Sequence, residues 1–283
     1  MEKTLTRQIL FLLGRRYGVS REVLEKLSQL KPLQDIWLAY HSTLVGSWAA
    51  RLALKEGCNH SKAFVLGVIH DLYEVIGVEE LLKTLREIGL GELEQNVREL
   101  VGEPLEKLSC ETKCVADADI LAKAGFSGIL SLTASTVYRE EDPVTLAVRV
   151  LPRTLTILSN PMDTLFTRSA RKIAKALLEK TREVFLGLLE ELKLHGMPLV
   201  PAEAKMRGRQ LHYAKLVFCP ACSSTQLEVK VVDGGENNTV VRIVQMCRKC
   251  GYKMETVMPK PWKLHEHIRK ASFAWKKKPQ KRV

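Results

Sequence analysis

Residues 67–76, GVIHDLYEVI, place His70, Asp71 and Glu74 inside a run that is otherwise apolar or aromatic. His41 lies in a similar setting in AYHSTLVGSWAA (39–50), and Asp119 does so in VADADILAKAG (115–125). An ionised carboxylate among apolar neighbours costs free energy unless a cation compensates its charge. The sequence therefore predicts that two histidines and two aspartates from separate segments converge on a bound metal ion.

The donor atoms of such a site would be two imidazole nitrogens and carboxylate oxygens. This mixed set suits Mn²⁺, Fe²⁺, Co²⁺, Ni²⁺ or Zn²⁺, and Mg²⁺ is also possible. An ion of this kind lowers the pKa of a bound water molecule and neutralises a phosphate oxygen. The residue types therefore favour hydrolytic chemistry.

The first 200 residues have an almost wholly helical pattern. Apolar residues recur at helical spacing in 5–14, 21–30, 36–56, 61–76, 78–90, 93–101 and 170–194. The third of these segments belongs to one long expected helix, with Asp35 in its first turns and Gly57 as its stop. The expected fold is mainly α, a helical bundle that is followed by a small β module.

The order of the four candidate ligands resembles that of the HD superfamily of metal-dependent phosphohydrolases. The similarity covers roughly residues 20–195 and includes DADILAKAGFSGIL (117–130), a Met162–Thr164 pair and the helical stretches that follow. A lone His-Asp pair is a weak motif, whereas four positions in order with these flanks are fairly specific.

The resemblance implies that His41, His70, Asp71 and Asp119 are the metal ligands. Asp119 is preferred over Asp117 because the last aspartate of the superfamily usually follows a small residue. In relatives that cleave nucleoside monophosphates, a glutamate at the offset of Glu74 helps to handle the attacking water. Glu74 and Asp117 are therefore the candidates for proton transfer, and one metal ion is expected rather than two, because no second histidine pair is evident.

Each of these polar residues has an ordinary structural explanation as well. A histidine can be a hydrogen-bonded core residue, and an aspartate can cap a helix or pair with a lysine. The occurrence of all four residues in the expected order favours a metal centre over these structural explanations. An intermediate case is a helical domain of this type that has lost turnover and retains a structural metal.

Cys219, Cys222, Cys247 and Cys250 form two Cys-x-x-Cys pairs. The segment between them contains two β-branched runs around a glycine-rich turn, which predicts a hairpin. Two such pairs at the open end of a hairpin are typical of a zinc ribbon with a closed, structural site. A redox role is the alternative, although no thioredoxin-like βαβ unit surrounds the pairs. Cysteines 58, 110 and 114 are interpreted as buried small apolar residues.

The excess positive charge lies entirely at the end of the chain. Residues 1–200 carry 26 basic and 26 acidic residues, whereas residues 201–283 carry 18 basic and 6 acidic ones. Cations beside aromatic rings suit RNA or single-stranded DNA, because they can contact phosphates and stack on bases. A solvated tail that keeps the protein soluble is the alternative. The candidate nucleic-acid-binding residues are Arg248, Lys249, Lys260, Trp262, Lys263, Arg269, Lys270, Trp275, Lys276, Lys277 and Lys278.

The expected organisation is an HD-type domain over 1–200, a linker over 201–214, a zinc ribbon over 215–259 and a basic tail over 260–283. No apolar run is long enough for a membrane span, and two Cys-x-x-Cys pairs point to a reducing compartment such as the cytoplasm. The expected function is a phosphohydrolase that acts on RNA or DNA, hence nuclease-like. The alternatives are a nucleotide phosphohydrolase with a protein-binding ribbon and a non-catalytic nucleic-acid-binding factor; the sequence does not indicate the oligomeric state.

Overall fold

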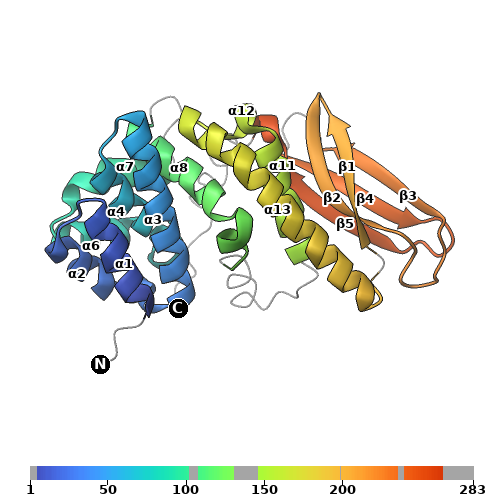
Figure 1. Ribbon diagram of the computed structural model, residues 1–283, viewed down its shortest axis with the longest axis horizontal. Helices are drawn as coiled ribbons and strands as arrows, with labels where there is room; N and C mark the ends of the chain where they lie inside the picture. Colours follow the sequence, from blue (N-terminus) through green and yellow to red (C-terminus); the bar gives the residue numbers. More distant parts are fainter. Residues whose placement is uncertain (1–4, 102–107, 131–145, 198, 235–238, 264–283) are drawn as a thin grey trace. The chain divides into compact units, whose positions relative to one another are not determined.

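A computed structural model describes residues 5–101, 108–130, 146–197, 199–234 and 239–263 (Figure 1). These residues form two compact units. The first contains the described residues up to 123 together with 165–173, and the second contains 124–164 and 174 onward. Within the described residues, the chain therefore passes between the units three times, whereas the sequence predicted a single domain boundary near residue 200.

The first unit is helical, as the periodicity predicted. Its core is built on α3 (Ile36–Glu56), which packs against α4 (His60–Ile69) and α8 (Cys110–Ala122), and α4 also packs against α8. The side chains of Ser20, Asp35, Asn59 and Ser109 accept backbone N–H groups at the starts of α2, α3, α4 and α8. The elements are α1 (Leu5–Arg16), α2 (Arg21–Gln29), η1 (Lys31–Gln34), α3 (Ile36–Glu56), α4 (His60–Ile69), α5 (Leu72–Ile76), α6 (Val78–Glu87), η2 (Gly91–Leu93), α7 (Glu94–Val101) and α8 (Cys110–Ala122).

Two glycines bring α3 and α4 unusually close together. A Cβ atom added to Gly67 would lie 2.6 Å from the Cα of Gly46, and one added to Gly46 would lie 2.8 Å from the carbonyl oxygen of Phe64. Because both contacts are with backbone atoms, no side-chain movement could relieve them. The absence of side chains at these two positions therefore sets the distance between the two helices.

The helix expected over 61–76 is interrupted at His70 and Asp71. The regular part of α4 ends at Ile69, and Asp71 is the N-terminal flanking residue of the short helix α5. The chain changes direction where α4 ends. The side chains of the adjacent residues His70 and Asp71 can therefore both approach the same point.

The second unit combines helices with two antiparallel sheets. The helical elements are η4 (Leu146–Val150), α11 (Leu151–Ser159), α12 (Pro161–Thr164), the part of α13 (Arg168–Leu194) from residue 174 onward, and η5 (Pro261–Lys263). The strands are β1 (Leu199–Met206), β2 (Arg209–Leu216), β3 (Leu227–Asp233), β4 (Val240–Cys247) and β5 (Lys253–Pro259). The sheet orders are β1-β2 and β3-β4-β5.

The linker expected over 201–214 is instead a β-hairpin. Strands β1 and β2 pair from Leu199↔Leu216 to Met206↔Arg209 around a two-residue turn. Arg207 and Gly208 both have positive φ, as a primed hairpin turn requires. Pro201 suggested a break in the sequence, but proline is tolerated in an edge strand, and a strand of a two-stranded sheet has one open edge.

The larger of two apolar clusters in the second unit joins its helices to the β1-β2 hairpin. Leu151 and Leu155 of α11 pack with Phe185 and Leu189 of α13 and with residues of both β1 and β2. The buried Gln245 side chain connects the two sheets, because its Nε2 donates to the Ala214 carbonyl (2.7 Å) and its Oε1 accepts from the Leu216 N–H (2.8 Å). The predicted hairpin over β3 and β4 is confirmed, with β5 as a third strand.

Within the described ranges, no helix has both the length and the apolar character needed to cross a membrane.

Candidate metal centres

The structure brings together four side chains from three segments of the first unit. His41 comes from the second turn of α3, His70 and Asp71 from the break between α4 and α5, and Asp119 from the last turns of α8. One donor atom of each residue lies within 4.8 Å of the corresponding atoms of the other three. Residues that are 78 positions apart in the chain therefore share one small site.

The distances between these donors match those of ligands around one ion. His41 Nε2 lies 3.4 Å from Asp71 Oδ2 and 3.4 Å from Asp119 Oδ1. His70 Nε2 lies 3.1 Å and 3.6 Å from the same two oxygens. Ligands at bond lengths of ~2.1 Å are about 3.0 Å apart at right angles and about 3.4 Å apart in a tetrahedron. The four residues therefore fit one divalent cation.

Two buried atoms of the site make no hydrogen bond within the described chain: His70 Nε2 and Asp119 Oδ1. The other ring nitrogen of His70, Nδ1, lies 2.8 Å from the Gly67 carbonyl oxygen, to which it can donate. That hydrogen bond places the proton of a neutral ring on Nδ1 and leaves the Nε2 lone pair facing the site. Unsatisfied buried atoms of this kind are what a metal site requires of its ligands.

The electrostatics of the site call for a positive charge. Burial of the His70 ring favours its neutral form, but Asp71 and Asp119 outweigh this effect and raise the pKa of His70 to about 10. Burial acts against the ionised form of both carboxyls, yet the pKa of Asp71 is lowered by His70 and that of Asp119 by Lys123. With both carboxylates ionised, either an imidazolium or a metal ion must compensate them.

Lys123 and Tyr73 belong to the surroundings of the site and were not predicted. Lys123 Nζ lies 2.6 Å from Asp119 Oδ2, so that only Oδ1 of this carboxylate faces the histidines. The spacing of Asp119 and Lys123, one helical turn, is a signal in the sequence that would have identified this pair. Burial, followed by the charges of Glu74, Asp71 and Asp119, raises the pKa of the Tyr73 hydroxyl, which places this residue among the carboxylates.

Asp117 does not face the metal site and has a structural role, contrary to the sequence-based assignment. Its side chain is completely buried, and its two oxygens accept the backbone N–H groups of Phe166 and Thr167, both at 2.8 Å. Burial outweighs these hydrogen bonds and raises the pKa of Asp117 to about 6. Asp117 and Asp119 are two positions apart on α8, with Ala118 between them, so their carboxyls point to different sides of the helix.

Glu74 lies in α5, and its backbone N–H donates to the Asp71 carbonyl at 3.0 Å. Its side chain is exposed. A role in proton transfer remains a prediction for this residue.

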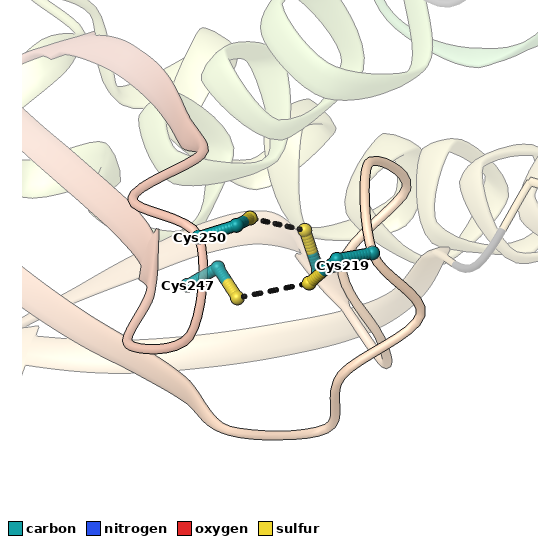
Figure 2. Close-up of side chains that lie close together, drawn as sticks. Cys219, Cys247 and Cys250 are labelled. Atoms are coloured by element: carbon teal, nitrogen blue, oxygen red, sulfur yellow. Dashed lines mark hydrogen bonds between the residues drawn. The ribbon is translucent and has the colours of Figure 1, made fainter.

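The second centre consists of the four ribbon cysteines, which the structure also brings together. Figure 2 shows Cys219 facing Cys250 across the gap between the two turns, with Cys247 beside them. The Sγ distances are 3.5 Å from Cys219 to Cys250 and 3.6 Å from Cys222 to Cys247. A tetrahedral zinc–thiolate site with bonds of ~2.3 Å has sulfurs about 3.8 Å apart, so that this set fits a zinc ion with a small expansion.

The backbone around these cysteines prepares them for metal binding. The Cys219 N–H donates to the Ser224 carbonyl, and the Cys247 N–H donates to the Tyr252 carbonyl, which closes both turns. The pKa of Cys247 is lowered to about 6, first by the backbone N–H of Cys250. Stabilisation of a thiolate favours metal binding, because the thiolate is the ligand.

The predicted nucleic-acid-binding residues differ in their exposure to solvent, and some of them lie outside the described part of the chain. Arg248 and Lys249 are exposed beside the second ribbon turn, and Arg248 approaches Glu228 at 3.4 Å. Lys260 is 1% exposed and pairs with Asp233, so it is a buried structural residue and not part of a binding surface. The ring of Trp262 lies under the guanidinium of Arg207, at 5.5 Å. The side chain of Lys263 and residues 269, 270 and 275–278 lie outside the described part of the chain.

Comparisons with known proteins add little to this picture. No protein-family model and no curated protein matches the chain. Bacillus subtilis YpgQ, solved in complex with ADP, is 19% identical over 66% of this chain and 97% of its own, with a TM-score of 0.45. A predicted HD superfamily hydrolase from an uncultured Thermotogales bacterium is 20% identical over 66% of this chain and 92% of its own, with a TM-score of 0.36. Likenesses of this size carry no argument about chemistry, which has to come from the site.

Proposed function

We propose that the chain is a metal-dependent phosphohydrolase of the HD type. The observation that supports this function is the convergence of two imidazoles and two carboxylates, with His70 Nε2 and Asp119 Oδ1 buried and lacking hydrogen bonds. A divalent ion held by His41, His70, Asp71 and Asp119 would lower the pKa of a bound water and polarise a phosphoryl oxygen.

The protein residues define how a substrate reaches this centre. The histidine side chains are 14% and 7% exposed, whereas those of Asp71 and Asp119 are 30% and 27% exposed. A phosphate group therefore approaches from the carboxylate side. Lys123 holds Asp119 in orientation through Oδ2, and the Gly67 carbonyl orients the His70 ring. Glu74, exposed on the same short helix that Asp71 precedes, is the candidate to accept a proton from the attacking water.

The proposal is tested by metal content and by hydrolysis of a generic phosphodiester, such as bis-(p-nitrophenyl) phosphate, with added Mn²⁺. We expect Asp71→Asn to remove the labile ion and lower the rate by at least ~100-fold, with folding unchanged. Asp163→Asn is the matched control, because it removes an aspartate of the second unit that pairs with Arg209 at 2.9 Å. The enzyme proposal would be contradicted if the wild-type protein bound no ion besides the ribbon zinc and stayed inactive after metal supplementation. That result would favour the alternative of a non-catalytic nucleic-acid-binding factor.

For the substrate, we propose RNA or single-stranded DNA. The support is the location of the whole excess positive charge in residues 201–283, and the exposure of Arg248 and Lys249 beside the ribbon turn. Phosphate contacts by these residues would release counterions, so binding would weaken steeply as salt rises.

The measurement compares hydrolysis of RNA, single-stranded DNA and mononucleotides by the wild type and by the double variant Arg248→Gln/Lys249→Gln. We expect the double variant to raise KM for the polymers several-fold without changing KM for mononucleotides. Lys83→Gln, at a lysine of α6 whose side chain is 62% exposed, controls for the loss of a surface charge. Hydrolysis of mononucleotides alone, without salt-dependent polymer binding, would support the nucleotide phosphohydrolase instead.

A further inference from the structure

A third group of potential ligands lies in the first unit and shares no residue with either centre described above. Cys58 follows the C-terminal end of α3, Cys110 is the first residue of α8, and Cys114 lies one turn later on the same helix. Their sequence-based interpretation as buried apolar residues holds only for Cys114. Cys110 is exposed and Cys58 is partly exposed.

The three sulfur atoms lie within 4.8 Å of one another. Cys58 and Cys110 are joined by a disulfide bond, with their Cα atoms 6.0 Å apart. The sulfur of Cys114 lies 4.0 Å from that of Cys58. Thiolates around one ion at ~2.3 Å are about 3.8 Å apart in a tetrahedron and about 4.0 Å apart in a trigonal plane. The distance between the Cys58 and Cys114 sulfurs therefore matches two thiolates of one ion, and reduction of the disulfide would free the Cys110 sulfur to act as the third.

The backbone holds these residues together independently of the sulfur atoms. Gly57 ends α3 with a φ of 75°, and the Cys58 N–H donates to the Ala53 carbonyl at 2.9 Å, which turns Cys58 toward α8. The Asn59 N–H then donates to Glu111 Oε1 at 3.0 Å, which attaches this turn to the first turn of α8. Both sides of the cluster are therefore positioned without the disulfide.

We propose that, in the reduced chain, Cys58, Cys110 and Cys114 bind one thiophilic d¹⁰ ion, Zn²⁺ or Cu⁺, as three thiolates. Three protein ligands leave a coordination position open toward solvent beside the exposed Cys110, which a water molecule fills for Zn²⁺ and which a trigonal Cu⁺ leaves vacant. The site fastens the end of α3 to the start of α8. It is independent of the proposed hydrolase activity.

The disulfide and the metal-bound form are related by a balanced exchange. A two-electron reductant, such as a dithiol or a phosphine, cleaves the Cys58–Cys110 bond, and two protons convert the sulfurs to thiols. The ion then displaces the three thiol protons and forms three metal–sulfur bonds, without a change in its own oxidation state.

The geometry makes Cys114 the third ligand. Its sulfur is buried, lies 4.0 Å from that of Cys58 and takes no part in the disulfide. A bound metal ion deprotonates a coordinating thiol directly, so the burial of Cys114 does not prevent its ligation.

The experiment titrates the full-length chain with Cd²⁺, a probe for Zn²⁺, in the presence of a phosphine reductant, and follows thiolate-to-metal charge-transfer absorbance. The chain has 7 cysteines, of which 4 lie in the ribbon. We expect the triple variant Cys58→Ser/Cys110→Ser/Cys114→Ser to reach about four-sevenths of the wild-type absorbance. A parallel Cu⁺ titration against a competing chelator, in which the wild type takes up one equivalent more than the variant, identifies Cu⁺ as an accepted ion.

Equal Cd²⁺ absorbance and equal Cu⁺ uptake in the wild type and the triple variant would overturn the proposal. The single variant Cys110→Ser guards against misfolding, because this residue is exposed. It should lower the affinity for the additional equivalent at least tenfold, and an unchanged affinity would also count against the site.

Discussion

Asp117 and Asp119 illustrate how two identical side chains on one helix take different roles. The oxygens of Asp117 satisfy two backbone N–H groups, whereas Asp119 presents an unsatisfied oxygen to two histidines. The sequence DAD favoured Asp119 as the ligand through the small residue before it, but it does not reveal that Asp117 meets the loop at Phe166 and Thr167. That information depends on the tertiary contact between α8 and a segment about 50 residues away.

This difference predicts the outcome of Asp117→Asn. An asparagine has only one acceptor oxygen, so one N–H would face the amide group and lose its partner. We expect a loss of about 1–3 kcal/mol in the free energy of unfolding, measured by denaturant titration, with unchanged metal content. Asp119→Asn is the matched comparison: it should lose the ion and retain most of the stability. If Asp117→Asn instead kept its stability and lost activity, the catalytic assignment would be restored.

His212 provides a pH-dependent contribution to stability. The ring is 3% exposed, with Nε2 at 2.8 Å from Ser159 Oγ and Nδ1 at 3.3 Å from Glu203 Oε1. Burial, together with the charge of Arg182, lowers the pKa of His212 below its usual value, although Glu203 opposes the shift. The folded state therefore favours the neutral ring.

Because the unfolded chain takes up this proton at a higher pH, stability falls as the pH drops below about 6.5, and the loss ends once the folded ring is protonated too. One proton gives a slope of at most about 1.4 kcal/mol per pH unit. We expect His212→Gln to reduce the slope between pH 7 and pH 5, as measured by urea unfolding at each pH. Identical slopes for the two proteins would contradict the neutral buried ring.

At the scale of elements, α3 was the most predictable feature. The segment between Asp35 and Gly57 forms one helix, because an N-terminal aspartate cap and a C-terminal glycine act locally. The break at His70 and Asp71 and the β1-β2 hairpin were missed. The first is imposed by packing around the site, and the second contains a proline that suggested a linker.

The close approach of α3 and α4 predicts a strong effect of Gly67→Ala. The new methyl group would lie 2.6 Å from the Gly46 Cα, so the helices must separate and carry His41 away from His70. We expect the free energy of unfolding to fall by about 1–3 kcal/mol and the labile metal ion to be lost. Thermal unfolding and metal analysis measure these two effects. Gly187→Ala in α13 is the control, because a Cβ there meets nothing within 4 Å, and it should be neutral or stabilising.

At the scale of the whole molecule, the two units should differ in their dependence on zinc. The three-stranded sheet is small. One cysteine turn precedes β3 in the sequence and the other begins at the end of β4, so a zinc ion bound by both turns would hold this hairpin closed. We propose that zinc supplies much of the folding free energy of the sheet. Treatment with a strong chelator should remove hydrogen-exchange protection from β3, β4 and β5, while α3, α4 and α8 keep theirs. Full protection of β4 after complete zinc removal would show that the ribbon is stable without metal.

The candidate sites were predictable to the extent that their residue types are unusual for their surroundings. Four polar residues in apolar helical segments and four cysteines in two Cys-x-x-Cys pairs can be recognised from the sequence alone. Tyr73 and the cluster of Cys58, Cys110 and Cys114 were missed because their roles arise where separate segments meet. Lys123 was missed although its spacing of one helical turn from Asp119 is visible in the sequence. Lys260 was misassigned because a lysine at the start of a basic stretch suggests exposure, whereas it pairs with Asp233 in the interior.

Gly67 combines two functions that are usually divided between residues. Its missing side chain admits α3, and its carbonyl accepts the hydrogen bond from His70 Nδ1. Every other amino acid would add a Cβ at this position, so any substitution disturbs the helix spacing and the orientation of a ligand in the same event. Point mutations that adjust this candidate metal centre without disturbing the spacing of α3 and α4 therefore have to occur at positions other than residue 67.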